Sequence, residues 1–188
     1  NALINTNGDA EIQVSEATAF TGQISCNSQN ISDLTGIEAF TALTTLNCAY
    51  NQLTSIDVTQ NTALTFLYCH YNQLTSLDVT QNTALEYLWC ATNQLTSLDV
   101  SQNTALTEMR CDNNQLTSID VTQNTALASL FCIGNQLTNL DVSQNTALTV
   151  LYCWSNQLTS LDVSGATALT NLDCQNNQLT CLNVKNGN

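Results

Sequence analysis

Positive charge is almost absent from this sequence, which has only Arg110 and Lys185 against 15 acidic residues, and it contains no proline. The formal net charge of −13 would repel phosphate backbones and anionic membrane surfaces. No apolar run approaches the roughly 20 residues of a membrane-spanning helix, and nothing at the start resembles a signal peptide. We therefore expect a mature or trimmed chain that neither binds nucleic acid nor inserts into a membrane.

Residues that commonly catalyse reactions are also scarce. His70 is the only histidine, and no motif fixes a nucleophile next to it. The carboxylates fall into regular files, and no separate pair stands apart for acid and base roles. The sequence therefore predicts a protein without enzymatic activity.

The chain instead contains short sequence motifs that recur at a fixed spacing. Cys48, Cys69, Cys90, Cys111, Cys132, Cys153 and Cys174 lie 21 residues apart, and Cys26 precedes the first of them by 22. Written from Thr41, one unit reads TALTTLNCAYNQLTSIDVTQN. A period this short indicates about eight stacked coils, because no single unit could bury its apolar edge alone.

Each coil contains a short alternating stretch followed by a constant asparagine. Leu46 and Cys48 alternate with polar or small residues, as expected of a strand with one buried face. Asn51 then marks a bend, where its side chain could satisfy backbone groups of its own turn and of the next coil. We therefore expect a parallel sheet along one side of the stack.

These positions carry a family resemblance. Leu43-x-x-Leu46-x-Cys48-x-x-Asn51-x-Leu53 resembles the signature of leucine-rich repeats, and the Leu-Asp-Val-x-x-Asn half is similar to their 21-residue bacterial (IRREKO-type) variant. The resemblance covers residues 24–184. It implies a β-rich leucine-rich repeat solenoid of the α/β class, a right-handed stack of coils with a parallel β-sheet on one face. It also implies a bacterial binding protein that is secreted or displayed on the cell surface.

The two ends of the repeat array differ. Residues 1–23 are expected to form a short helical cap, with Phe20 and Phe40 available to cover the first coil. Residues 185–188 form only a polar tail, so we expect a chain cut from a longer protein. An apolar last coil left uncapped would favour self-association.

Comparison between coils separates scaffold positions from variable ones. All five tyrosines and both tryptophans lie at outward strand positions or in the two positions after the cysteine. Aromatic residues favour strands in general, but that preference does not explain their exclusion from the other repeat positions. The predicted ligand-binding face comprises Phe66, Tyr68, His70, Tyr71, Tyr87, Trp89, Glu108, Arg110, Asp112, Phe131, Tyr152 and Trp154.

Two classes of partner suit this face. A protein would use the aromatic residues and Arg110 as anchors, whereas a polysaccharide would stack on Tyr68, Trp89 and Trp154. A structural spacer or stalk of a larger surface protein is the main alternative. The regular threonine file that includes Thr54 adds ice binding as a third hypothesis.

The other regular files have simpler interpretations. The cysteine file predicts buried, reduced thiols, because a single file lacks the converging pairs of a metal site. Cys181 lies outside that file, and a disulfide with Cys174 is an alternative for it. The aspartate file that includes Asp57 and Asp78 is expected to accept hydrogen bonds from turn amides, since one carboxylate per coil is too few for calcium.

A separate calcium motif precedes the repeats. Residues 5–16, NTNGDAEIQVSE, are similar to an EF-hand or dockerin-type loop. The ligand positions are Asn5, Asn7, Asp9, Glu11 through its backbone carbonyl, and Glu16. Asn5 replaces the expected first aspartate, and Ala10 replaces the glycine of the sharp turn. The alternative is a polar cap in which Ser15 begins the helix as its N-cap.

Overall fold

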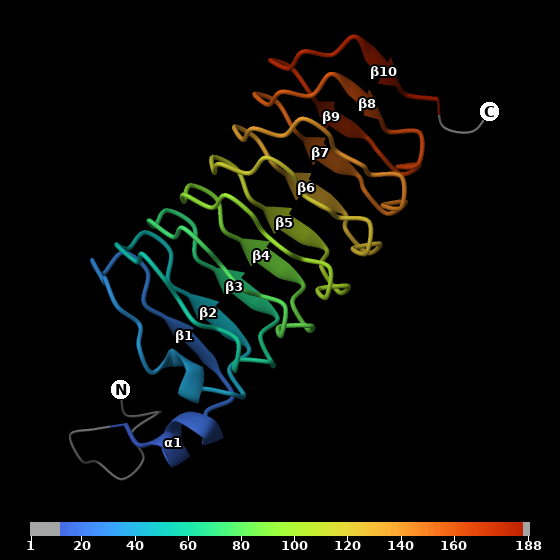
Figure 1. The fold of residues 1–188 in the computed structure, drawn as a ribbon. Helices are drawn as coiled ribbons and strands as arrows, with labels where there is room; N and C mark the ends of the chain where they lie inside the picture. The colour runs from blue at the N-terminus through green and yellow to red at the C-terminus, as the bar shows by residue number, and fades with distance from the viewer. Residues whose placement is uncertain (1–11, 186–188) are drawn as a thin grey trace.

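The computed structural model describes residues 12–185 and shows a solenoid of short strands stacked in parallel (Figure 1). One eight-stranded sheet follows the length of the stack. Its strands, in spatial order, are β1 (Gln23–Ser25), β2 (Thr45–Asn47), β3 (Phe66–Tyr68), β4 (Tyr87–Trp89), β5 (Glu108–Arg110), β6 (Ser129–Phe131), β7 (Val150–Tyr152) and β9 (Asn171–Asp173). The predicted leucine-rich repeat solenoid is confirmed.

Each of the strands β2 to β7 buries its central residue and turns its two flanking residues outward. Leu67 of β3 is 0% exposed and pairs in register with Leu46 and Leu88 of the neighbouring strands. Phe66 and Tyr68 on either side of it are only partly buried. The period of two along a strand therefore forms one file of core leucines and two outward files, in which equivalent residues of successive coils are neighbours.

The constant asparagine after each strand links adjacent coils. The Nδ2 group of Asn72 donates to the carbonyl oxygens of Cys69 in its own coil and Cys48 in the preceding one, each at 3.1 Å. Its Oδ1 accepts from the backbone N–H of Leu53 at 3.0 Å. The prediction that this asparagine bonds between coils is confirmed, but its partner is the preceding coil rather than the next.

A second asparagine file, the last residue of the Leu-Asp-Val-x-x-Asn half, lies inside the stack, and the sequence analysis gave it no role. Asn103 is 0% exposed, and its Nδ2 donates to the carbonyl oxygens of Val79 and Asn82 at 2.8 and 2.9 Å. The file ends where Ala166 takes the asparagine position. Gly165 lies beside Ala166, and a Cβ there would fall 2.3 Å from the backbone oxygen of Ser143. The two coils therefore approach each other more closely at Gly165 than a residue with a Cβ would allow.

The N-terminal end of the stack is covered by helix α1 (Val14–Ala19) and the 3-10 helix η1 (Ile37–Ala39) (Figure 1). Phe20 and Phe40 meet edge to face, with ring centroids 6.1 Å apart, as the expected cap requires. The N-cap of α1 is Gln13, so the alternative that Ser15 begins the helix is wrong. The Glu16 carboxylate accepts from the Gln13 backbone N–H at 3.1 Å, which fixes the first turn.

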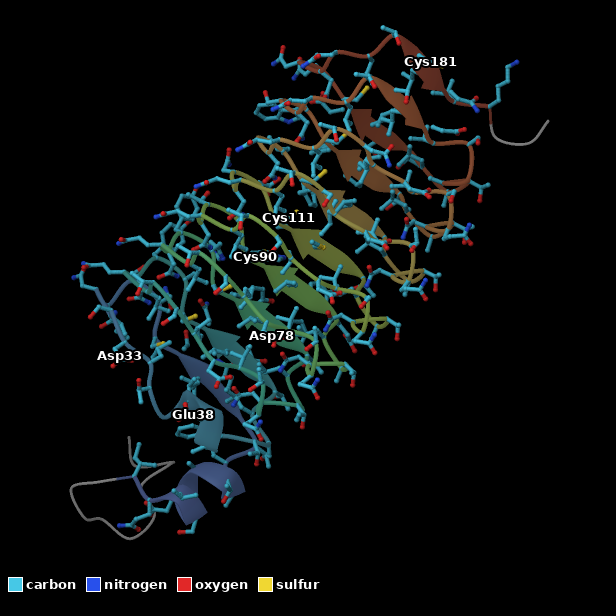
Figure 2. The ribbon with its side chains drawn as sticks, viewed as in Figure 1. Asp33, Glu38, Asp78, Cys90, Cys111 and Cys181 are labelled. Carbon is cyan, nitrogen blue, oxygen red and sulfur yellow. The ribbon has the colours of Figure 1, made fainter. Side chains whose placement is uncertain are left out.

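The C-terminal end has a feature that the sequence analysis did not predict. Strands β8 (Ser160–Asp162) and β10 (Cys181–Asn183) form a second, two-stranded parallel sheet. Cys181 lies on β10 at the end of the stack (Figure 2), and both it and Cys174 are free thiols, so the alternative of a disulfide is not realised. Leu182 and Val184 are exposed beside it.

Candidate functional site

Five side chains on the outward side of the sheet form one continuous stack, here called the central ladder. They are Tyr68, Trp89, Arg110, Phe131 and Tyr152, which occupy the same register position on β3 to β7. Tyr68 meets Trp89 at 4.9 Å between ring centroids, and Phe131 meets Tyr152 at 5.3 Å, both edge to face. The ladder therefore places π-systems and a cation at the spacing of adjacent strands, about 4.8 Å.

Arg110 is the centre of the ladder. Its guanidinium carbon lies 4.4 Å from the ring centroid of Trp89 and 4.4 Å from that of Phe131. Its Nε also donates to Glu108 Oε1 at 2.6 Å. The two residues lie two positions apart on β5, so the period of the strand directs both to one face. Cation–π contacts and an ion pair thus hold the guanidinium in a fixed orientation.

Other aromatic residues stack on each side of the ladder. Phe66 and Tyr87 lie face to face with centroids 4.8 Å apart. Tyr50 and Tyr71 stack at 4.5 Å with an interplanar angle of 10°, and their exposed fractions are 52% and 48%. Tyr50 is missing from the predicted face, although it shares the repeat position of Tyr71 and that shared position could have identified it.

The repeat position of Tyr50 and Tyr71 has an unusual backbone. Both residues have a left-handed conformation, with φ of 56° and 54°, and so does Thr92 with φ of 54°. Gly134, which has a φ of 63°, fills the same position in a later coil without a Cβ. The left-handed conformation costs a residue with a Cβ roughly 1–2 kcal/mol, and a β-branched residue such as threonine adopts it least readily. Large aromatic side chains are therefore present here despite a local cost in backbone energy.

A groove of about 360 Å³ lies beside the central ladder. Its lining includes Tyr71 and His70 towards one end, Asp112 in the middle, and Ile133 and Trp154 towards the other end. Asp112 Oδ1 accepts from the backbone N–H of Ile133 at 3.2 Å. Between the two ends the lining includes Ala91, Thr92 and Asn113, whose side chains are smaller than the rings of Tyr71 and Trp154.

The titratable groups of the groove are shifted in opposite senses. Burial raises the pKa of the Asp112 carboxyl, and the bond from Ile133 and the charge of Arg110 only partly oppose it. Burial and the nearby Arg110 charge both lower the pKa of His70. His70 is therefore neutral at pH 7, and its Nδ1, like Nε1 of Trp89, is buried without a hydrogen-bond partner among residues 12–185.

The structure brings half of the predicted face together around the groove. His70, Tyr71, Trp89, Arg110, Asp112 and Trp154 all line it. Phe66 and Tyr87 form a stacked pair in which Phe66 also contacts Tyr68. Tyr68 and Tyr152 form the ends of the central ladder, and Glu108 and Phe131 hold Arg110. The sequence analysis placed these residues on one side of the sheet but did not predict the groove.

The cysteine file is part of the core. Cys90 and Cys111, in successive coils (Figure 2), are 0% exposed. Burial raises the pKa of each of these thiols well above its usual value, and it raises that of Cys48 to about 12. The prediction of buried, reduced thiols is confirmed for Cys48 to Cys153, whereas Cys26 and Cys174 at the two ends of the file are only partly buried. The buried thiols are poor nucleophiles because they stay protonated.

The aspartate file caps turns within single coils. Asp78 Oδ1 accepts from the backbone N–H of Thr80 at 2.9 Å and from its hydroxyl at 2.7 Å. These bonds lower the pKa of Asp78, which confirms the predicted role. In the part of the chain that the structure describes, no group of three or more His, Cys, Asp or Glu residues could hold a metal ion. The threonine file lies at bends outside both sheets.

Most of the predicted calcium ligands lie outside the described residues. These are Asn5, Asn7, Asp9 and Glu11. Glu16, the remaining ligand position, is buried on α1 with its carboxylate at the helix start. Calcium binding by residues 5–16 stays a prediction from the sequence.

Comparisons with known proteins match this architecture. Residues 62–103 and 146–186 match the family model described as leucine rich repeats (2 copies). A segment of 46 residues is 48% identical to Internalin J of Listeria monocytogenes serotype 4b, covering 24% of this chain and 5% of that protein.

Two solved structures extend the comparison. The functional domain of InlJ from Listeria monocytogenes, which includes a cysteine ladder, is 45% identical with a TM-score of 0.85, over 91% of this chain and 40% of that one. Internalin C2 from strain 4b F2365 of the same species has a TM-score of 0.79 at 21% identity, over 96% of this chain and 84% of that one, and shows the fold alone.

The similarity therefore reaches the sequence as well as the fold, while this chain spans less than half the length of either InlJ match. None of the helices described is long and apolar enough to cross a membrane. The repeats, the solenoid and these relatives together support a bacterial leucine-rich repeat protein with internalin-like homologues.

Proposed function

We propose that the solenoid is a non-catalytic binding or adhesion module that recognises a protein through the outward face of its sheet. The observation that carries the proposal is the central ladder, in which five variable positions hold Tyr68, Trp89, Arg110, Phe131 and Tyr152, while the central strand position beneath them is leucine in four coils and methionine in the coil of Arg110. Tyrosine, tryptophan and arginine dominate the energetics of protein interfaces. The internalin-like relatives support a module of this class, secreted or displayed on a bacterial surface.

The orientation of the rings favours a protein over a polysaccharide. The guanidinium of Arg110 covers faces of Trp89 and Phe131, and Tyr68 packs against Trp89. A sugar that stacks needs a free ring face, and the rings of the ladder are instead packed against each other. The ladder offers ring edges, tyrosine hydroxyls and a held cation, which suit the mixed polar and apolar surface of a protein.

Parallel arrays of proteins and of glycans can test this proposal. Tyr68→Ser and Tyr152→Ser remove the two ends of the ladder and leave Arg110 in place. Thr96→Ser alters an exposed bend outside the sheets and serves as the matched control. We expect a protein ligand whose affinity falls about 30-fold or more in the tyrosine variants, the effect of losing a hot spot of about 2 kcal/mol, and is unchanged in the control.

The other outcomes distinguish the alternatives. Binding only to glycans, lost in the same tyrosine variants, would replace the protein with a polysaccharide. Binding that is equally strong in all three variants would locate recognition elsewhere. Normal adhesion by the whole protein with the tyrosine variants would support a spacer or stalk.

A further inference from the structure

The groove contains an acidic group without a cationic partner. Among the described residues, Asp112 forms no salt bridge, because the nearby Arg110 is bound to Glu108 at 2.6 Å. His70, also in the groove, is kept neutral by burial and by the Arg110 charge. The positive charge of Arg110 and the negative charge of Glu108 cancel within this group of side chains, so the negative charge of Asp112 is left over. The groove therefore has a half-buried negative charge that a cation could neutralise.

The molecule already shows how this face holds a cation. Arg110 lies between two rings, with its guanidinium 4.4 Å from each centroid, and a carboxylate on the same strand binds it. That arrangement combines cation–π contacts with a charge-assisted hydrogen bond. It is a slot for a basic side chain, filled by the chain's own arginine.

The groove offers similar groups, a carboxylate and two aromatic rings, at a wider spacing: each ring follows a strand two coils from that of the carboxylate, about 10 Å away by the strand spacing. Tyr71 follows β3 and Trp154 follows β7, while Asp112 follows β5, midway between them. The Tyr71 ring contacts the Tyr50 and His70 rings, and the Trp154 ring contacts no other ring or cation among the described residues. Both rings thus retain surface for a ligand, on either side of a carboxylate.

Size and overall charge also fit a basic group. A volume of about 360 Å³ is near the lower end of ligand pockets, roughly 300–1,000 Å³, and suits one or two side chains. The net charge of −13 attracts positively charged surfaces over long range. A neutral sugar would benefit from neither the charge of Asp112 nor this long-range attraction.

We propose that the groove binds an arginine or lysine side chain presented by the protein partner, with Asp112 as its counter-ion and Tyr71 and Trp154 as flanking aromatic residues. The second oxygen of Asp112 accepts from the cation while the first keeps its bond to the Ile133 backbone. This inference rests on the proposed function and adds the chemistry of the partner: a basic residue at the centre of its contact surface.

A titration with small probes tests the inference without a known partner. N-acetyl-arginine amide is compared with N-acetyl-citrulline amide, its neutral isostere, by following backbone amide signals in NMR spectra. The variants are Asp112→Asn, which keeps the bond from Ile133, and Asp173→Asn as control. Asp173 is an aspartate of β9 outside the groove lining, and its Oδ1 likewise accepts from a backbone N–H, that of Gln175 at 3.2 Å.

We expect saturable shifts at Tyr71, Asp112 and Ile133, with the arginine probe binding about fivefold or more tightly than citrulline. That preference should persist in Asp173→Asn, whereas Asp112→Asn should bind the two probes about equally. Equal binding of the two probes, an unchanged preference in Asp112→Asn, or no shift at the solubility limit would overturn the inference. If partner binding still depended on Tyr68 and Tyr152, such a result would reject the basic side chain and leave the proposed function standing.

Discussion

Replacing Arg110 by alanine is the most direct test of how the central ladder is held together. The change removes the guanidinium from between Trp89 and Phe131 and breaks the bond to Glu108. Each cation–π contact contributes about 0.5–1 kcal/mol at a partly exposed site, and an exposed ion pair contributes about 0.2–1 kcal/mol. We expect Arg110→Ala to lower the free energy of unfolding by about 1–3 kcal/mol.

Two further variants separate geometry from charge. Arg110→Lys keeps the charge but loses the planar group that contacts both rings. We therefore expect its free energy of unfolding to lie between those of the wild type and Arg110→Ala. Lys185→Ala is the matched control, because it removes the other basic residue and likewise changes the net charge from −13 to −14. Lys185 is exposed, so its removal should change stability by less than about 0.5 kcal/mol.

Urea denaturation followed by circular dichroism measures these differences, provided that the slope of the transition is the same in all variants. In a Trp154→Phe background, the fluorescence of Trp89 additionally reports whether its environment depends on Arg110. If Arg110→Ala and Lys185→Ala were equally stable, and if Trp89 emission were unchanged, the contacts of Arg110 would not hold the ladder.

Further predictions concern the scaffold, the groove and the N-terminal loop. Asn103→Asp replaces the donor to two backbone carbonyls by an oxygen at a fully buried site, and denaturation should show a loss of at least about 3 kcal/mol, well above that of Asn103→Leu. Gly165→Ala should cost about 1–3 kcal/mol in the same assay, because its Cβ would lie 2.3 Å from the backbone oxygen of Ser143. Burial raises the pKa of Asp112 above its ordinary value of 3.8, so the folded state binds its proton more tightly and the ionised form lowers stability at neutral pH. Asp112→Asn should therefore be more stable than the wild type at pH 7. This difference in stability should disappear as the pH falls through the raised pKa of Asp112 to below 3.8, where the carboxyl is protonated in both states. An equal difference at pH 7 and pH 3 would exclude burial of the ionised carboxyl as its cause. Calcium should raise the melting temperature if residues 5–16 bind it, and an unchanged temperature across a titration would contradict that prediction.

The sequence predicts the scaffold well because the 21-residue period of the repeat equals the length of one coil and so gives the register of adjacent strands. Residues 21 positions apart, such as Leu46 and Leu67, pair in register, so one coil defines all the others. The exceptions lie where the repeat changes. Gly165 and Ala166 replace a Gln-Asn pair, and strands β8 and β10 form a second sheet near the same end of the stack.

The candidate site is less predictable because it depends on side-chain orientation rather than on spacing. Comparison of equivalent repeat positions correctly placed Trp89 and Arg110 side by side. It did not reveal that the guanidinium would cover the ring face of Trp89. The groove has a similar origin. It lies where side chains smaller than the rings of Tyr71 and Trp154, such as Ala91 and Thr92, line the surface between them. That space depends on several repeat positions at once, so no single position predicts it.

The left-handed turn after each strand explains why this face can vary without loss of the fold. Asn72 donates to the carbonyl oxygens of Cys69, in its own coil, and Cys48, in the preceding one, and so fixes the chain on both sides of Tyr71. A residue in the left-handed region is retained only where surrounding bonds over-determine it, and the repeated asparagine supplies those bonds in each coil. Tyr71 and Gly134 can therefore occupy equivalent turns with almost the same φ, 54° and 63°. The bonds of the constant asparagine thus offset the backbone cost of a residue with a Cβ at this turn, so the side chain at the position of Tyr71 can vary without loss of the fold.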